Sequence, residues 1–545
     1  MSRDALTHHL AIPKLYLLHG GLLDLPDIPF SYYPMNLDLL YLLPLSFGND
    51  ILPKYIHLLF GVMTAGLIYH YLKTRIGSPW GLCGALLWLS TPVVVRLSSE
   101  VYVDLGLGFF SMAALYSILR WSESGHNQSG LIFAGLWCGL ALGTKYNALL
   151  LLAVLSLMIP FIYTRIRVGA GKVAADETVR SVERTAHPSV NRRTGSSSLR
   201  ALMSAVVFAG VALIVFSPWM IRNTILKSNP VYPMLNQLFN PGEPRAQDDW
   251  SRTSTMVQNT SNTLTVRRLV FKEPFGYIAL MPLRIFFEGQ DDDPRHFDGK
   301  LNPFLPLFLI AALVFWHADT RRLAAERWVW FIFAVLFLLM AFFLAPIRIR
   351  YIVPILPAVT VLAVIGIYNL KAFTAAIHHP VARRTGEIVL AAAVVAMFGL
   401  NADYIVNRYK QGEPSAFLSG QISRDEYITR RRPEYPLVQY ANANLAPDAR
   451  ILGLFLGQRR YYFDRDVTFN EGWLVKAVKE ADSSGEIRRG LKKRGITHLM
   501  VRGDLFQRWV SNSMSPAEID RLTVLWEINV KKLMDSGGFA LFELE

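Results

Sequence analysis

Long apolar runs alternate with short charged segments along the chain, from about residue 52 to residue 404. Runs of this kind are typical of helices that cross a bilayer, each of which needs about 20 apolar residues. They predict a polytopic membrane protein with about ten spans. The expected spans cover residues 52–72, 79–97, 101–119, 129–143, 147–164, 202–221, 303–317, 328–345, 351–369 and 387–404.

The basic residues predict the orientation of these spans. If the chain crosses once per span, Lys and Arg gather in loops on one side, which the positive-inside rule assigns to the cytoplasm. The residues concerned are Lys73, Arg75, Arg120, Arg165, Arg167, Lys172, Arg180, Arg184, Arg192, Arg193, Arg200, Arg321, Arg322, Arg327, Lys371, Arg383 and Arg384. The weakly apolar stretch 275–287 contains Pro282 and Arg284, and we expect it to lie at the interface without crossing.

The expected organisation has three parts. Residues 1–50 form a first external loop with an amphipathic helix, and residues 51–404 form the transmembrane helical domain. Within the latter, residues 168–199 read as a disordered cytoplasmic linker and residues 222–302 as an external loop. Residues 405–545 have the composition of a small external α/β domain. Its runs 451–456, 496–501 and 539–545 predict strands, and 486–494 predicts a helix.

Charge and cysteine content exclude several classes of function. The 545 residues are 52% hydrophobic and carry a formal net charge of +14, but the membrane loops account for that charge, so no nucleic-acid partner is expected. Cys83 and Cys138 both lie in apolar runs and predict neither a disulfide framework nor a metal pair. No Gly-rich nucleotide loop or zinc-protease motif occurs. A cleavable signal peptide is not visible, so we expect insertion to depend on internal spans.

The first sixteen residues combine Asp4, His8, His9 and Lys14 with apolar neighbours. If residues 4–11 are helical, Asp4 and His8 project from one face, because they lie four positions apart. A carboxylate on a short helix along a membrane can act as a general base or hold a metal. A solvated amphipathic start of the chain is the alternative.

Ionisable residues beside the predicted spans indicate a site at the outer face. Asp104 lies just inside a span, where a charge costs about 2.5 to 3.5 kcal/mol at mid-membrane and usually marks function, although it could also reach water without a role. Lys145, Arg222, Arg348 and Arg350 are cations on the side that the positive-inside rule disfavours. Together they suit a phosphate at headgroup level, whereas any one Arg could equally pair with lipid headgroups.

Two further groups of polar residues have open interpretations. Asp291, Asp292 and Asp293 could hold a metal, but three acids before a proline more often form a solvated loop. Asn36 and Asp38 close the first loop, where they could contact substrate or form a turn.

Several short motifs resemble those of bacterial membrane glycosyltransferases of the GT-C fold. In chain order they are Asp-Ala-Leu-x-x-His-Leu-x-x-Pro-Lys-x-Tyr, Tyr-Pro-Met-Asn, Leu-Ser-Thr-Pro, Tyr-Val-Asp-Leu-Gly, Gly-Thr-Lys-Tyr-Asn, Pro-Trp-x-x-Arg-Asn, Asn-Pro-Val-Tyr-Pro and Arg-Tyr-x-x-Pro-x-x-Pro. The resemblance is to family 39, the protein O-mannosyltransferases, and to the lipid A aminoarabinose transferase, and it runs from residue 3 to about 404. The expected fold is therefore a mainly α, GT-C-like transmembrane bundle with a small α/β extracytoplasmic C-terminal domain.

The resemblance implies inverting transfer of a sugar from a polyprenyl-phosphate donor to a lipid, glycan or protein acceptor. It implies a bacterial inner-membrane location, with the transfer at the outer face among membrane lipids. Asp4 matches the first-loop acid that serves as base or metal contact, and Asp104 matches a second acid. Lys145 and Arg348 or Arg350 match cations that hold the donor phosphate. Arg222 is added to this group because it lies at the end of a predicted span. His9, Lys14 and Asn36 are further candidate substrate contacts, and a divalent metal on Asp4 and Asp104 is an open expectation.

One departure from that pattern leaves two alternatives open. Family members have a span before the first-loop acid, whereas here only Met1, Ser2 and Arg3 precede Asp4. The native chain is then longer, or this copy is truncated and serves as an inactive scaffold. A transporter or flippase of lipid-linked sugars would use similar cations, but such proteins often carry internal repeats, and none is visible here.

Overall fold

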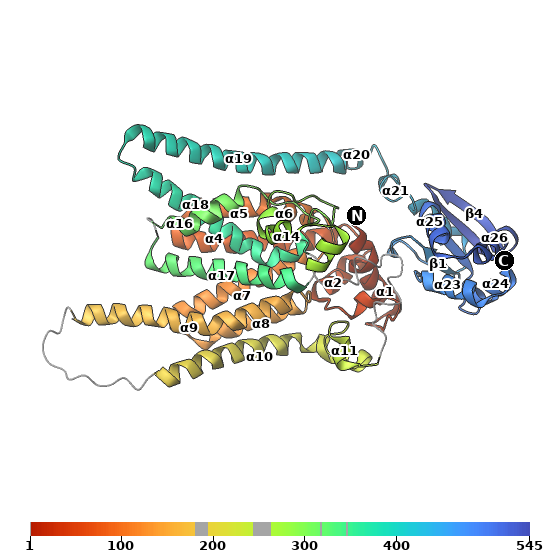
Figure 1. Cartoon of the computed structure of the whole chain (residues 1–545), viewed down its shortest axis with the longest axis horizontal. Helices are drawn as coiled ribbons and strands as arrows, with labels where there is room; N and C mark the ends of the chain where they lie inside the picture. Colours follow the sequence, from red (N-terminus) through yellow and green to blue (C-terminus); the bar gives the residue numbers. More distant parts are fainter. Residues whose placement is uncertain (1, 180–193, 243–262, 317–318, 345–346) are drawn as a thin grey trace.

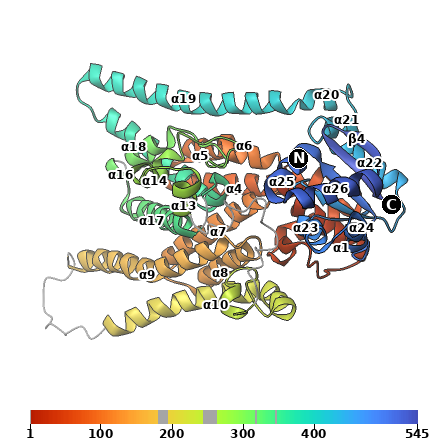
Figure 2. The same ribbon diagram turned by 45° about the vertical axis from the view of Figure 1, so that its right-hand side comes forward.

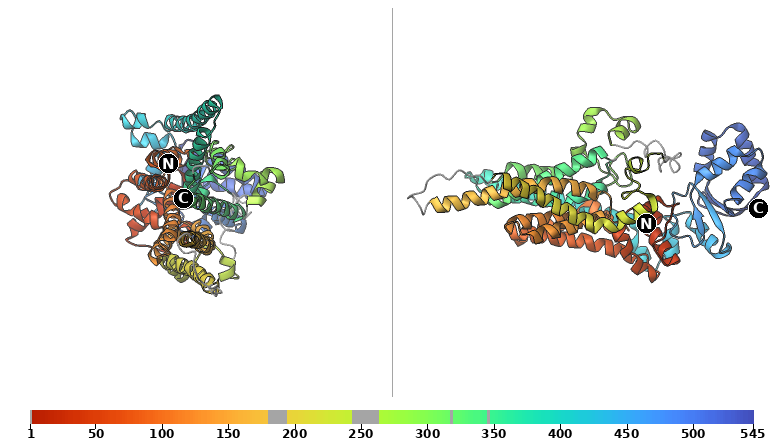
Figure 3. Two further views of the ribbon diagram at one scale, coloured as in Figure 1. Left: turned by 90° about the vertical axis from the view of Figure 1, so that its left-hand side faces the viewer. Right: turned by 90° about the horizontal axis from the view of Figure 1, so that it is seen from below.

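The structure is a computed structural model that describes residues 2–179, 194–242, 263–316, 319–344 and 347–545. Long helices run along one axis and form an elongated body, and a smaller domain of helices and strands lies at one end of it (Figure 1). The N-terminus lies at the end of the helical body that faces this domain, as two perpendicular views agree (Figures 1 and 3).

Within the described residues, five helical stretches are long and apolar enough to cross a membrane. They are Leu52–Ile76 (α4), Ser198–Lys227 within α10 (Thr194–Lys227), Arg321–Phe343 within α17 (Arg321–Leu344), Ile349–Ala375 (η4, Ile349–Ile355, with α18, Leu356–Ala375) and Pro380–Gly412 (α19). Shorter apolar helices lie beside them: α8 (Gln128–Leu142), the first part of α9 (Ala148–Val179) and α16 (Leu305–Val314). The chain is an integral membrane protein.

The expected span 79–97 is a broken helix. It consists of α5 (Ser78–Ser90) and α6 (Pro92–Ser98), bent by 64° at Thr91. Thr91 has an extended backbone because the following proline disfavours the helical conformation at the residue before it. The expected linker 168–199 also differs, because helices cover both of its ends. Helix α9 continues to Val179 and α10 begins at Thr194, so only 180–193 of the expected linker 168–199 lie outside the described residues.

Helix α18 forms the centre of the bundle. In its most apolar window 89% of the residues are buried, against 17% for α19, which flanks the body. Helices α16, α17, α19, α4, α5 and α7 (Asp104–Glu123) all contact α18. Helices α8 and α10 approach closely at Gly135 and Gly139, where a Cβ on Gly139 would lie 2.7 Å from the Ala212 carbonyl oxygen. Small residues one turn apart allow such close packing in membranes.

Short helices cap the bundle at the end that faces the smaller domain. The first segment contains η1 (Ala5–His9), α1 (Ala11–His19), η2 (Pro29–Tyr32), α2 (Asn36–Leu40) and α3 (Leu42–Ser46). Between α10 and α16 lie α11 (Asn236–Phe239), α13 (Thr263–Thr265), η3 (Val266–Val270), α14 (Phe275–Ala279) and α15 (Met281–Arg284). Each helix of the stretch 275–287 is thus too short to cross a bilayer. Residues 243–262 of the expected external loop lie outside the described residues.

The C-terminal domain is a mixed sheet covered by helices. The strand order is β2 (Asp466–Thr468), β1 (Arg450–Leu454), β3 (His498–Arg502), β5 (Phe539–Leu544) and β4 (Val530–Ser536). Strands β2, β1 and β3 are parallel, with Ile451 opposite His498, and the last two are antiparallel to their neighbours. Helices α20 (Pro414–Leu418), α21 (Arg424–Thr429), α22 (Tyr435–Asn444), α23 (Glu471–Glu480), α24 (Ser484–Lys492), α25 (Gly503–Ser513) and α26 (Pro516–Ile528) complete it.

Two cores lie on the two faces of this sheet. Leu452, Leu454 and Leu499 point to the core with α23 and α24, whereas Ile451 and Met500 point to the core with α22. This alternation is the period of two that a strand imposes. It confirms a small α/β domain after the membrane helices, although α19 extends the helical part to Gly412.

Candidate functional site

Charged side chains from four separate parts of the chain meet at the bundle end that faces the C-terminal domain. Asp4 precedes helix η1, Asp104 begins α7, Lys145 lies in the turn between α8 and α9, and Arg350 lies in η4. The chain thus brings together four of the residues predicted from the sequence. They are joined by the two ion pairs described below and by shared aromatic neighbours.

Asp4 forms an ion pair with Arg350. Arg350 donates from Nη1 to Asp4 Oδ2 at 2.6 Å, and the guanidinium lies 5.1 Å from the centre of the Tyr102 ring. The Asp4 side chain is 28% exposed, so its carboxylate remains accessible beside a largely buried arginine. Burial by itself raises the pKa of Asp4, but the charge and hydrogen bond of Arg350 outweigh it and hold that pKa well below the usual range. Asp4 is therefore ionised.

Asp104 is buried and holds Lys145. Its side chain is inaccessible to solvent, and Lys145 Nζ donates to Asp104 Oδ1 at 2.7 Å. Helix α7 is fixed just below this carboxylate, because the Leu105 N–H donates to Nε2 of the fully buried His57. Asp104 Oδ2 has no partner among the described residues. The carboxylate thus orients Lys145, whose ammonium is the partly exposed member of the pair.

Three cations surround the ring of Tyr351. The Lys145 ammonium lies 5.3 Å from the ring centre, the Arg350 guanidinium 5.3 Å and the Arg348 guanidinium 5.9 Å. Aromatic faces attract cations over such distances. Sequence analysis missed Tyr351 as part of the site, although it follows Arg350 directly at the start of a predicted span. The ring gathers three of the four predicted phosphate-binding cations into one group, without Arg222.

The acidic segment 291–293 interacts with an arginine. Arg96 donates to Asp291 at 3.2 Å, to Asp292 at 2.7 Å and to Asp298 at 3.0 Å. Asp298 also accepts from Arg348 at 3.1 Å. Asp291 and Asp292 therefore orient Arg96, and Asp298 orients both Arg96 and Arg348. The three acids considered as a metal site, Asp291, Asp292 and Asp293, form no metal-holding group among the described residues. Of the three, Asp293 makes a separate ion pair with His296.

The two histidines of the first helix lie against the same site. His9 Nδ1 lies 2.7 Å from Asp38 Oδ1, and both side chains are buried. Burial raises the pKa of Asp38 to about 7 and lowers the pKa of His9 to about 4. His8 stacks on Phe30 with ring centres 4.4 Å apart, and burial lowers its pKa to about 3. Both imidazoles are neutral, and His9 and Asp38 hold a proton between them.

Three predicted residues bind protein groups near this site. Lys14 contacts the C-terminal domain, as described further below. Arg222 donates to the carbonyl oxygens of Ser31 at 3.0 Å and Leu23 at 3.2 Å. Asn36 accepts from Trp219 Nε1 at 2.8 Å, and its backbone N–H donates to the Gly143 carbonyl at 2.8 Å. These bonds connect the first segment to α10 and to the turn that carries Lys145.

The donor set for a metal ion is weak. Within the residues that the structure describes, no three His, Cys, Asp or Glu side chains form a group that could hold a metal. Asp4 and Asp104 each already have a cation partner. The two carboxylates as arranged do not fit a divalent ion, and no step below is assigned to one.

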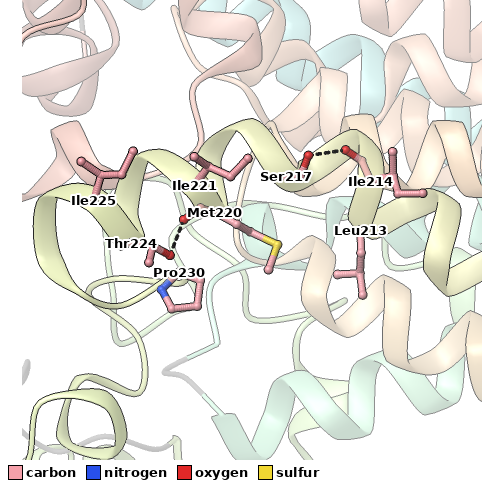
Figure 4. A pocket seen from close by; sticks show the side chains of 8 residues that line it. All are labelled: Leu213, Ile214, Ser217, Met220, Ile221, Thr224, Ile225 and Pro230. Carbon is pink, nitrogen blue, oxygen red and sulfur yellow. Dashed lines mark hydrogen bonds between the residues drawn. The ribbon is translucent and has the colours of Figure 1, made fainter.

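An apolar groove lies elsewhere, on the outer face of α10 (Figure 4). The two hydroxyls in it, on Ser217 and Thr224, donate to carbonyls of their own helix. The remaining lining is apolar: Leu213, Ile214, Met220, Ile221, Ile225 and Pro230. A groove of this kind offers no cation for a phosphate and no titratable group for proton transfer, so the charged cluster is the candidate site.

Comparison with known proteins supports the architecture. The sequence profile of the dolichyl-phosphate-mannose-protein mannosyltransferase family matches residues 47–168. No curated protein matches the sequence. The apo structure of ArnT from Cupriavidus metallidurans aligns with a TM-score of 0.55 at 14% identity, over 99% of this chain and 93% of that one. The structure of ArnT bound to undecaprenyl phosphate gives a TM-score of 0.53 at 12% identity over the same shares. The expected GT-C fold is thereby confirmed.

Proposed function

We propose that the protein is an inverting glycosyltransferase that moves a sugar from a polyprenyl-phosphate donor to an acceptor hydroxyl. The observation that carries this proposal is the partly exposed carboxylate of Asp4 beside the three cations around Tyr351. A base and a phosphate-binding group are what such a transfer requires. The profile match to a family named for a lipid-phosphate sugar donor, and an ArnT structure that holds undecaprenyl phosphate, support the same donor class.

The cations would stabilise the leaving group. As the bond between the anomeric carbon and the phosphate oxygen breaks, the electron pair stays with the phosphate and its negative charge grows. Lys145 has three N–H donors, of which Asp104 accepts one, so two remain for phosphate oxygens. Arg348 and Arg350 supply forked donors suited to phosphate. Asp104 acts here as a positioning residue, because its side chain is inaccessible to substrate.

Asp4 would accept the proton of the attacking hydroxyl. The acceptor oxygen attacks the anomeric carbon from the face opposite the phosphate, its proton passes to the carboxylate, and the configuration inverts. In the ligand-free pair with Arg350, Asp4 is a weak base. A donor phosphate that binds Arg350 weakens this pair and raises the pKa of Asp4 toward its usual value. Donor binding therefore prepares the base.

We place the site at the outer face of a bacterial inner membrane, with the C-terminal domain on the same side. The predicted cytoplasmic cations support this orientation. Arg75 donates to Glu326 at 2.7 Å near the C-terminal end of α4, and Arg322 pairs with Glu326 at 3.0 Å. This network joins the C-terminal end of α4 to the start of α17. Both of these helix ends lie away from the charged site.

The decisive experiment measures release of free polyprenyl phosphate from a panel of polyprenyl-phosphate sugars by the detergent-purified protein. We expect release by the wild type and a loss of about 10² to 10⁴-fold in Asp4→Asn, the usual contribution of a general base. Asp27→Asn is the matched control, because it alters an exposed acid of the same segment. Equal rates in Asp4→Asn and wild type would exclude Asp4 as base, and no release with any donor would refute the function. Turnover without a membrane gradient excludes transport as the sole activity.

A further inference from the structure

The C-terminal domain contacts η1, the helix that directly follows Asp4. In η1 the Leu10 N–H donates to the Ala5 carbonyl at 2.9 Å, a bond one residue longer than in an α-helix. The Leu6 carbonyl therefore lacks the donor that an α-helix would supply. The backbone N–H groups of Arg460 and Tyr461 both donate to it, at 3.1 Å each. Single π-turns of this kind often occur at functional sites.

Lys14 forms the second attachment. Its ammonium donates to the carbonyl oxygens of Tyr461 and Phe463, at 3.0 Å each, and to Asp464 Oδ1 at 2.8 Å. A lysine has three N–H donors, so all of them are used within the protein. This geometry leaves Lys14 no donor for the substrate contact suggested by its place in the sequence, and it gives the residue a different task.

An apolar contact completes the interface. The Tyr461 side chain packs against the small buried cluster of Ala5, Leu10, Tyr41 and Val101. Tyr41 donates to the Tyr102 carbonyl at 2.5 Å, two residues before Asp104. The segment 457–464 therefore touches η1, which follows Asp4, and a cluster that includes Val101, three residues before Asp104.

We propose that segment 457–464 of the C-terminal domain positions the catalytic carboxylate, so that the domain is part of the catalytic apparatus. The proposal rests on the proposed function. Asp4 lies just before η1. Segment 457–464 contacts this part of the chain through the Leu6 carbonyl, through Lys14, through the Tyr461 side chain and through a bond from Arg3 Nε to the Gly457 carbonyl at 3.2 Å. A displacement of about 1 Å at a catalytic group can cost about 100-fold in rate. Loss of the anchor should therefore reduce the rate of chemistry without weakening donor binding.

The test compares Lys14→Met with Lys14→Arg in the full-length protein. The methionine keeps the length of the side chain and removes all donors, whereas the arginine restores donors to the same carbonyls. We expect kcat to fall about tenfold or more in Lys14→Met and to recover at least partly in Lys14→Arg, with a Kd for polyprenyl phosphate that is at most about twofold weaker than in wild type. Amide hydrogen exchange of residues 2–16 should become faster in Lys14→Met only.

Several results would overturn the proposal. They are an unchanged kcat in Lys14→Met, a weaker Kd that accounts for the whole loss, or unchanged hydrogen exchange in residues 2–16. If Lys14→Met is not recovered from membranes, Asp464→Asn serves instead, because its carboxylate is 58% exposed and bonds the same ammonium. If wild type releases no polyprenyl phosphate, the proposed function fails, and the exchange comparison alone decides whether the segment holds η1.

Discussion

The ion pair of Asp104 and Lys145 allows a quantitative prediction. The carboxylate is inaccessible to solvent, whereas the lysine side chain is 20% exposed. Removal of one partner from a buried pair usually costs about 3 to 5 kcal/mol, because the other charge is left without compensation. Lys145→Met leaves the Asp104 carboxylate, which water cannot reach, without its partner. We expect the free energy of unfolding to fall by an amount near the upper end, about 5 kcal/mol. Asp104→Asn leaves the Lys145 ammonium, which water can reach, and we expect the free energy of unfolding to fall by about 3 kcal/mol.

The double variant isolates the interaction. With both charges removed, the free energy of unfolding should fall by less than the sum of the two single losses, with a coupling of about 1 to 3 kcal/mol. The assay is equilibrium unfolding of the detergent-purified protein, with Lys300→Met as control, because Lys300 is exposed at the same end of the bundle. Additive losses, or a larger loss in Asp104→Asn than in Lys145→Met, would refute this reasoning.

Three further predictions follow from the site. His9 and Asp38 share one proton in the fold, and between about pH 4.5 and 6 the unfolded pair also binds one, so the contributions of the pair to pH-dependent stability cancel. Asp38→Asn should expose the lowered pKa of His9, and stability should then rise from about pH 4 to pH 6.5. His9→Gln should expose the raised pKa of Asp38, so that stability falls as the pH rises through about 7. Denaturant titrations at several pH values measure the stability of both variants. Profiles of stability against pH that run parallel in the two variants would contradict the shared proton. Gly143→Ala should impair transfer, because the added Cβ would lie 2.0 Å from Asn36 Nδ2; full activity would show that Asn36 can move without effect. Chelation with EDTA should leave transfer unchanged, since both acids have cation partners, and a loss restored by Mg²⁺ or Mn²⁺ would contradict this.

The fold could be anticipated from the sequence where one strong pattern dominates. Apolar runs near residues 52, 202, 328 and 351 each coincide with a long helix. The bend at Thr91 could not be read from hydropathy, because the apolar character continues through Pro92. Strand β4 was missed because Lys531 and Lys532 break the alternation on an edge strand, where charges are tolerated.

The site could be anticipated in part. Asp4, Asp104, Lys145 and Arg350 do converge, as expected for acids and cations beside predicted spans, where charge is costly without a role. Lys14 and Arg222 show the limit of that argument, because a cation that binds backbone carbonyls and a cation that binds phosphate look alike in a sequence. Partners more than 190 residues away decide between them.

The length of helix α19 affects the position of the C-terminal domain. Its 33 residues measure about 50 Å at 1.5 Å per residue, against about 30 Å of hydrocarbon. It leads from the bundle toward the C-terminal domain, past α20 (Figure 2). The first segment also contacts this domain, because Lys14 donates to Asp464 and Asp50 accepts from Arg424 at 2.7 Å. Helix α19 and the first segment thus both hold the domain, so a lengthened or shortened α19 would strain the contacts that Lys14 and Leu6 make with segment 457–464.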